Sequence, residues 1–132
     1  MSAEQNAEMV RKTWLAWIKG DLDSALANMS DEVSWVIPGS LPNVSGLKRG
    51  KAAIREFGSG VTRAFPQGLT TDIKKVHSAG DTVILELTNK GKAHNGKDYS
   101  NEYCFIFEIE GGKIRRVREY VDLLTVKETL LS

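Results

Sequence analysis

The stretch Asn95–Asp122, NGKDYSNEYCFIFEIEGGKIRRVREYVD, indicates a β-hairpin with strands at about 98–110 and 113–122. Aromatic and β-branched residues are frequent in both strands, as is typical of β-structure. Gly111-Gly112 separates the strands and can adopt the positive backbone angles that a tight hairpin turn requires. The stretch therefore predicts the last hairpin of an antiparallel sheet.

Two similar turn signals lie upstream of this hairpin. Gly80-Asp81 and Asn95-Gly96 both match the preferences of short β-turns. They delimit two more predicted strands, 69–78 and 82–93. Three consecutive hairpins arrange the four strands as a meander.

The first half of the chain has helical periodicity. Asp21 is suited to cap a second helix, and Pro38-Gly39 ends a short strand before a loop that contains Gly46 and Gly50. Gly58 and Gly60 each weaken a helix by about 1 kcal/mol relative to Ala, so close packing is expected there. The predicted elements are helices at about 4–19, after Asp21 and at about 51–65, a strand at 33–37, and a last helix from Leu123.

Helices followed by a meander of strands predict the α+β class, and composition indicates a soluble globular protein. The 132 residues are 41% hydrophobic and 27% charged, and the net charge is +1. A nearly neutral chain has no basic surface for general nucleic-acid or anionic-membrane binding. The N-terminus lacks the pattern of a signal peptide, and a single cysteine excludes an internal disulfide. We therefore expect a cytoplasmic protein that binds neither nucleic acid nor membrane.

Strand alternation does not decide which face of the predicted strand at 82–93 points into the core. Leu85 and Leu87 share one face of their strand, and Glu86 occupies the other. Apolar content alone favours Leu85 and Leu87 in the core and Glu86 outside. Pattern does not decide which face looks inward.

Two stretches resemble a known family. EVSWVIPGSLPNVSGLKRGKAAIREF, residues 32–57, is similar to the strand, Pro-Gly loop and helix of SnoaL-like proteins and ketosteroid isomerases. Residues 95–122 resemble the last hairpin of the same nuclear transport factor 2 superfamily, which includes limonene epoxide hydrolases. The resemblance implies one SnoaL-like domain over residues 1–132. It also implies an α+β cone, in which a curved antiparallel sheet wraps around the N-terminal helices.

The resemblance also implies an orientation, a ligand pocket and a homodimer. Positions matching Glu86, Thr88, Phe105 and Glu119 point into the cone in relatives. The remaining expected pocket residues are Trp14, Trp35, Ile37, Phe57, Val61, Tyr103, Phe107 and Val117. An apolar outer face would then form a dimer interface, and its expected members are Val83, Leu85, Leu87, Cys104 and Ile106.

Two catalytic sets known in the superfamily are incomplete. Ile37, Thr13 or Trp14, and Phe105 match the three catalytic positions of a ketosteroid isomerase, and none carries the required group. Limonene epoxide hydrolases use an Asp–Arg–Asp set. Glu119 matches one carboxylate of that set, whereas the other positions fall near Glu86 and Thr88.

A SnoaL-type cyclase requires only one carboxylate, and Glu119 fits that role. Burial against aromatic walls would raise its pKa toward the range useful for acid/base chemistry. Glu86 is a weaker candidate that could share a proton with it. The prediction is a cofactor-free enzyme for cyclisation, isomerisation or hydrolysis of a small apolar organic substrate, without metal. Alternatively, Glu119 pairs with Arg115 or another basic group and only holds the sheet together. A further alternative is that the domain is a non-catalytic ligand-binding or dimeric interaction module.

The other polar candidates have simpler explanations. Asp122 is expected to cap the last helix, and Arg116 and Arg118 to face outward. His77 and His94 are expected to be structural or exposed.

Overall fold

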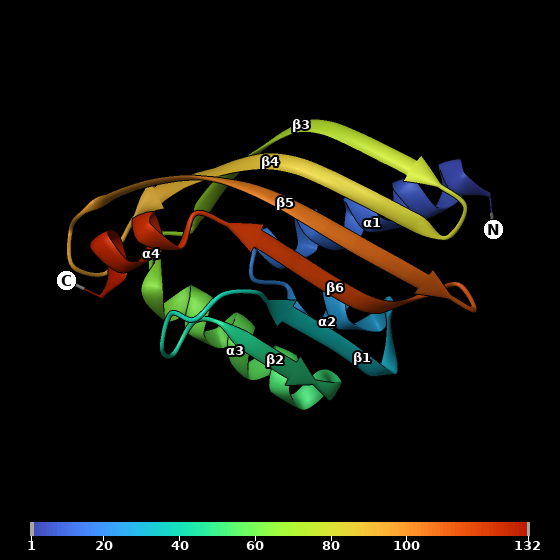
Figure 1. Ribbon diagram of the computed structural model, residues 1–132, viewed down its shortest axis with the longest axis horizontal. Helices are drawn as coiled ribbons and strands as arrows, with labels where there is room; N and C mark the ends of the chain where they lie inside the picture. The colour runs from blue at the N-terminus through green and yellow to red at the C-terminus, as the bar shows by residue number, and fades with distance from the viewer. Residues whose placement is uncertain (1, 132) are drawn as a thin grey trace.

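A computed structural model describes residues 2–131 as four helices and a curved sheet of six strands (Figure 1). The sheet is mixed and open, with strand order β2-β1-β6-β5-β4-β3. The elements are α1 (Ala3–Ile18), α2 (Leu22–Ala27), β1 (Met29–Ile37), β2 (Gly46–Arg49), α3 (Gly50–Ala64), β3 (Leu69–Ala79), β4 (Thr82–Lys92), β5 (Asp98–Glu110), β6 (Lys113–Val121) and α4 (Leu123–Leu130). This is the α+β cone that the sequence predicts.

The predicted meander is confirmed. Strands β3 to β6 pair in chain order, each antiparallel to the next. The β1 strand then extends the sheet by pairing in parallel with β6. The short β2 strand, which the sequence analysis treated as loop, pairs antiparallel with the end of β1. Its four residues are too few to show strand alternation, so pairing with β1 rather than local pattern determines it.

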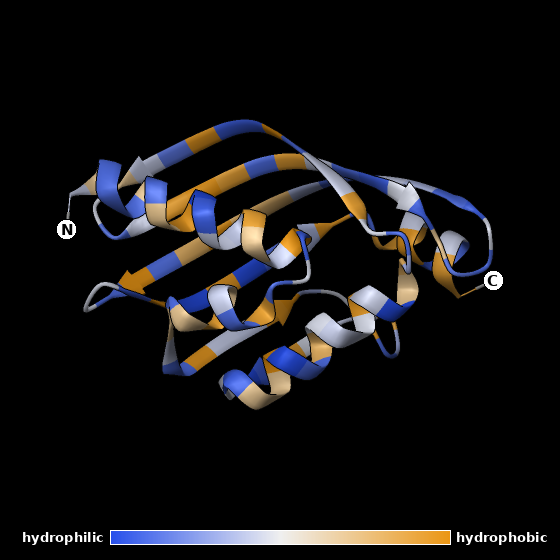
Figure 2. Cartoon of the chain, turned by 180° about the vertical axis from the view of Figure 1, so that it is seen from behind, coloured by the Kyte–Doolittle hydropathy of each residue, from blue (hydrophilic) through white to orange (hydrophobic). Residues whose placement is uncertain are grey.

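The helices α1, α2 and α3 cover the concave face of the sheet (Figure 2). Side-chain caps fix where they begin: Ser2 forms a capping box at α1, and Asp21 caps α2. Asp122 caps α4 through the backbone amides of Leu124 and Thr125, as predicted. Within the described residues no helix has the length and apolar character needed to cross a membrane.

The orientation of β4 corrects the expectation that was drawn from the family. Val83, Leu85 and Leu87 are at most 2% exposed and belong to the core, so they cannot form a dimer interface. The register explains why. Leu85 lies directly opposite Phe105, and residues paired in this way point to the same side of a sheet. Because Phe105 points inward, Leu85 must too, and simple apolar content predicted this strand correctly.

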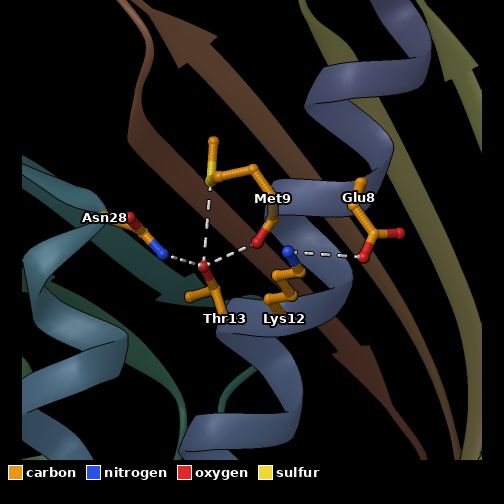
Figure 3. Close-up of polar contacts among 5 residues, drawn as sticks. All are labelled: Glu8, Met9, Lys12, Thr13 and Asn28. Carbon is orange, nitrogen blue, oxygen red and sulfur yellow. Dashed lines mark hydrogen bonds and ion pairs between the residues drawn. The ribbon is translucent and has the colours of Figure 1, made fainter.

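Thr13 on α1 has a structural role (Figure 3). Its hydroxyl donates to the Met9 carbonyl at 2.8 Å and accepts from the Asn28 side chain at 3.0 Å. Thr13 is buried, and these bonds tie α1 to the end of α2. The position that would carry a catalytic tyrosine in a ketosteroid isomerase is thus committed to helix packing.

Candidate functional site

A cavity of about 210 Å³ lies between the helices and the inner face of the sheet. Its wall combines residues of α1, α3 and α4 with residues of β5 and β6. Most of the wall is apolar, as in typical small-molecule sites. Among the residues expected to line a pocket, six do so: Trp14, Ile37, Phe57, Val61, Tyr103 and Phe105.

Four other expected pocket residues lie elsewhere. Trp35, Phe107 and Val117 are at most 1% exposed and belong to the packed core outside the cavity wall. Thr88 lies on the outer face of the sheet, because β4 has the opposite orientation to the one expected. The expectation was therefore wrong for these four positions. It did not distinguish inward-facing residues of the packed core from those that line the cavity, and it assigned the residues of β4 to the wrong faces of the sheet.

Aromatic rings form one side of the cavity. The Phe105 ring lies 4.5 Å from Trp14 and stacks on Tyr103 at 5.5 Å, measured between ring centroids. The Trp14 indole Nε1 donates to Thr71 Oγ1 at 3.0 Å. Because that N–H has its partner, the Trp14 ring is a purely apolar surface for a ligand.

Glu119 is the carboxylate of the wall. It extends from β6, is 7% exposed, and lies directly opposite Phe105 in the sheet register. The Trp35 indole Nε1 donates to Glu119 Oε1 at 2.9 Å. Arg115 is not its partner, because the Arg115 guanidinium pairs with Glu110 at 3.5 Å. Another basic group, Lys48, acts on Glu119 electrostatically.

Burial dominates the electrostatics of Glu119. Removal from water raises the pKa of the carboxyl group from 4.5 to about 7, because an ionised carboxylate loses its hydration there. The hydrogen bond from Trp35 and the positive charge of Lys48 both oppose this rise. The result is a carboxyl group that can hold or release a proton near neutral pH.

Lys48 is a site residue that the sequence analysis missed. It pairs with Trp35 across β1 and β2, and its ammonium group lies 4.4 Å from the centre of the Phe57 ring. Burial lowers the pKa of Lys48, and the nearby Glu119 raises it. Recognising 46–49 as a strand would have placed Lys48 beside Trp35, but that strand has no signal of its own.

A family model for the SnoaL-like domain matches residues 10–117. The chain belongs to this family. The cone described above is also the fold of a solved nuclear transport factor 2-like protein.

Solved structures resemble this SnoaL-like domain along nearly its whole length. Bal32a, from a soil-derived mobile gene cassette, is 27% identical with a TM-score of 0.87, over 97% of this chain and 98% of that one. A candidate isomerase from Bacillus subtilis is 25% identical with a TM-score of 0.85, over 98% and 95% of the two chains. A nuclear transport factor 2-like protein from Burkholderia pseudomallei is 19% identical with a TM-score of 0.89, over 100% of both. No curated protein matches the chain.

Glu86 does not contribute to the SnoaL-like cavity. It lies on the outer face, where its carboxylate contacts His77 Nε2 at 2.6 Å, and both side chains are half exposed. Glu86 pairs in register with Cys104, whereas Glu119 pairs with Phe105. The two carboxylates are thus on opposite faces of the sheet, and the expected proton sharing between them is wrong.

A second polar group in the wall was predicted only in part, since Tyr103 was an expected pocket residue and Asn89, Tyr99 and Asn101 were not. Asn89, Tyr99 and Tyr103 all line the cavity, and Asn101 lies directly opposite Asn89. We call these four residues the polar corner. Asn89 and Asn101 are at most 4% exposed, which is unusual for asparagine. Strand alternation places these residues on the inner face, but it does not show that their side chains meet.

The described part of the chain holds no group of three or more His, Cys, Asp and Glu side chains suited to a metal ion.

Proposed function

We propose that this SnoaL-like domain is a cofactor-free enzyme that uses Glu119 as a general acid/base on a small, mainly apolar organic substrate. The reaction class is cyclisation, isomerisation or hydrolysis. The observation that carries the proposal is a buried carboxyl group, with its pKa raised to about 7, in the wall of an apolar cavity. A base is most effective when its pKa lies near the working pH.

Each neighbour of Glu119 has a distinct effect in this proposal. The ionised carboxylate removes a proton from the substrate, which becomes an anion while Glu119 becomes neutral. Trp35 holds Oε1 in place, so Oε2 is the oxygen that faces the reacting proton. Lys48 stabilises the ionised form of Glu119 before the transfer. Neutral Glu119 then returns the proton at a second position or to a leaving group.

Replacement of Glu119 by Gln tests the proposal. The amide retains the size of the side chain and cannot take up a proton. We expect turnover to fall by at least ~100-fold, in line with the contribution of a positioned acid/base group. The matched control is Glu86→Gln, the same change on the outer face, which should leave turnover unchanged. Unchanged turnover in Glu119→Gln contradicts the proposal.

A binding module without turnover is the second candidate. It is favoured by the incomplete catalytic sets. Ile37 and Phe105 line the cavity at positions where a ketosteroid isomerase needs polar groups, and Glu86 and Thr88, at positions of the limonene epoxide hydrolase set, lie outside the cavity. Measuring exchange of ligand hydrogens with deuterium oxide distinguishes the two. A ligand that binds and shows no exchange or conversion favours the binding module.

The homodimer stays a prediction with a revised interface. The apolar residues of the outer face are Ile84, Cys104, Ile106 and Tyr120, of which Tyr120 is 38% exposed. We expect Ile106→Glu to reduce the sedimentation mass from dimer to monomer. A wild-type chain that sediments as a monomer contradicts the dimer.

A further inference from the structure

The polar corner contains an amide oxygen that has no hydrogen-bond partner. Asn89 is 2% exposed and lines the cavity, yet its Oδ1 accepts no hydrogen bond. An unsatisfied buried polar atom destabilises a folded protein, so most such atoms have partners. The neighbouring Asn101 shows the usual case. Its amide donates to the Tyr99 hydroxyl at 2.9 Å and to the Asp122 carbonyl at 3.0 Å, and its Oδ1 accepts from the Glu102 backbone at 2.9 Å.

The tyrosines of the corner leave one proton unassigned. The Tyr99 and Tyr103 hydroxyls are hydrogen-bonded to each other, which requires one proton. Each hydroxyl carries its own proton, so one of the two remains to be donated elsewhere. Burial raises the pKa of both groups, so both hydroxyls stay protonated at neutral pH.

Asn89 lies next to the tyrosine pair. Asn89 and Tyr103 are diagonal neighbours on the inner face, because Leu87 rather than Asn89 lies directly opposite Tyr103. A side-chain hydrogen bond with Asn89 opposes the rise in the Tyr103 pKa. The corner therefore offers an unsatisfied acceptor, Asn89 Oδ1, and a spare tyrosine proton in the same cavity wall.

A hydroxyl group complements this pair of functions. It can donate to Asn89 Oδ1 and accept the spare tyrosine proton. An ether accepts the tyrosine proton but has no proton to donate to Oδ1, and a hydrocarbon can do neither, so the preference for a hydroxyl follows from the amide orientation in which Oδ1 lacks a partner.

The volume limits the rest of the ligand. An engineered protein cavity of about 150 Å³, lined by Leu, Ile and Phe, binds benzene. This example relates cavity volume to ligand size. The present cavity, at about 210 Å³, therefore accommodates one six-membered ring with a short substituent. A polycyclic skeleton needs more room.

We infer that the cavity binds a monocyclic, otherwise apolar compound whose ring hydroxyl is bound by Asn89 and the Tyr99–Tyr103 pair. This inference deepens the proposed function and rests on it for turnover, since it names the substrate class. Glu119 lines the same cavity as Asn89, Tyr99 and Tyr103, so the bound ring lies within reach of Glu119 as well.

Calorimetric binding of three probes tests the inference without turnover. The probes are 4-ethylphenol, its methyl ether 4-ethylanisole, and the polycyclic 2-anthracenol. We expect 4-ethylphenol to bind about tenfold more tightly than 4-ethylanisole, the difference that one good hydrogen bond makes. We expect 2-anthracenol to bind more weakly than 4-ethylphenol. Equal binding of the phenol and its ether, stronger binding of 2-anthracenol, or no binding of any probe overturns the inference.

Two variants test whether the preference for 4-ethylphenol over 4-ethylanisole comes from the polar corner. Asn89→Leu should bind 4-ethylphenol and 4-ethylanisole equally, and Tyr103→Phe should reduce the preference in the same direction. Thr88→Val, the adjacent position on the outer face, is the control and should keep the tenfold preference. The Glu119→Gln variant separates the two proposals. If the preference survives in Asn89→Leu and disappears in Glu119→Gln, the hydroxyl is bound by Glu119; that overturns this inference and leaves the proposed function standing.

Discussion

The Trp35 indole and the Glu119 carboxylate, 84 positions apart in the sequence, are joined by a hydrogen bond of 2.9 Å that is buried within the sheet. Trp35 belongs to β1 and Glu119 to β6, and the two strands pair in parallel. An N–H donor binds an ionised carboxylate more strongly than a neutral carboxylic acid. The bond therefore favours the ionised state, while burial favours the neutral one, and the opposed effects leave the pKa at about 7.

Replacement of Trp35 by Phe should raise the Glu119 pKa further above about 7. Phe retains an apolar ring and removes the N–H donor, so burial acts with less opposition. Titration of ¹³C-labelled glutamate carboxyl groups by NMR measures the change. Trp14→Phe is the matched control, because the Trp14 N–H binds Thr71 and not Glu119. An unchanged or lowered pKa in Trp35→Phe contradicts this account.

Stability should depend on pH through Glu119. A carboxyl group with a raised pKa in the folded state stabilises that state fully below its unfolded pKa, and this stabilisation is lost as pH rises through the folded value. For Glu119 the window runs from 4.5 to about 7, which corresponds to a loss of about 3 kcal/mol.

Glu119→Gln should remove this loss, since the amide does not titrate. Urea unfolding at pH values between about 4 and about 8, in steps of about one, gives the free energy of unfolding of each protein. The dependence of this free energy on pH is then compared between the variant and the wild type. Glu86→Gln should retain the wild-type slope, because Glu86 is half exposed. A parallel decline in Glu119→Gln and wild type would show that other groups cause the pH dependence.

Several features could be predicted from the sequence because their causes are local. Gly111-Gly112 and Asn95-Gly96 define the hairpins through turn chemistry, and Asp122 caps α4 as its position before Leu123 suggested. Glu119 was identified as the candidate base from strand alternation and resemblance. Its wall position and its raised pKa are consistent with that role.

Other features depend on contacts between distant residues. Lys48 belongs to a strand that exists only through pairing with β1, and Asn89 meets Tyr103 only through the register of β4 on β5. Glu86 was misplaced because the family orientation outweighed the apolar count of its own strand. One residue of register reverses the facing of a whole strand, so an error of this kind moves every side chain together.

Replacement of Leu85 by Ala should cost about 2–5 kcal/mol of stability, as for other buried Leu→Ala changes. Leu85 is 0% exposed and belongs to the main core cluster. Ile106→Ala on the outer face is the control and should cost clearly less, because Ile106 is only partly buried. Urea unfolding at low protein concentration measures both. Equal costs would contradict the orientation of β4 described here.

Gly58 provides the last prediction, because a helix-interior glycine is expected to be replaceable by alanine with a gain of up to about 1 kcal/mol. At Gly58 an added Cβ would lie 3.0 Å from Trp17 Cη2 and 2.7 Å from Leu22 Cδ2. Leu22 can turn away, but the Trp17 ring is held between Trp35, at 4.6 Å, and Phe57, at 5.8 Å. Overpacking typically costs about 1–3 kcal/mol, so Gly58→Ala should be destabilising overall.

Gly60→Ala is the matched control in the same helix. The nearest atom to its added Cβ is Arg63 Nη2 at 3.7 Å, which is ordinary contact, so this variant should be stabilised or unchanged. Because Trp17 also lines the cavity, Gly58→Ala should weaken ligand binding together with stability. If both variants were stabilised by similar amounts, the Trp17 ring would be able to move aside for the added methyl group. The close approach between α1 and α3 would then not be the reason for glycine at position 58.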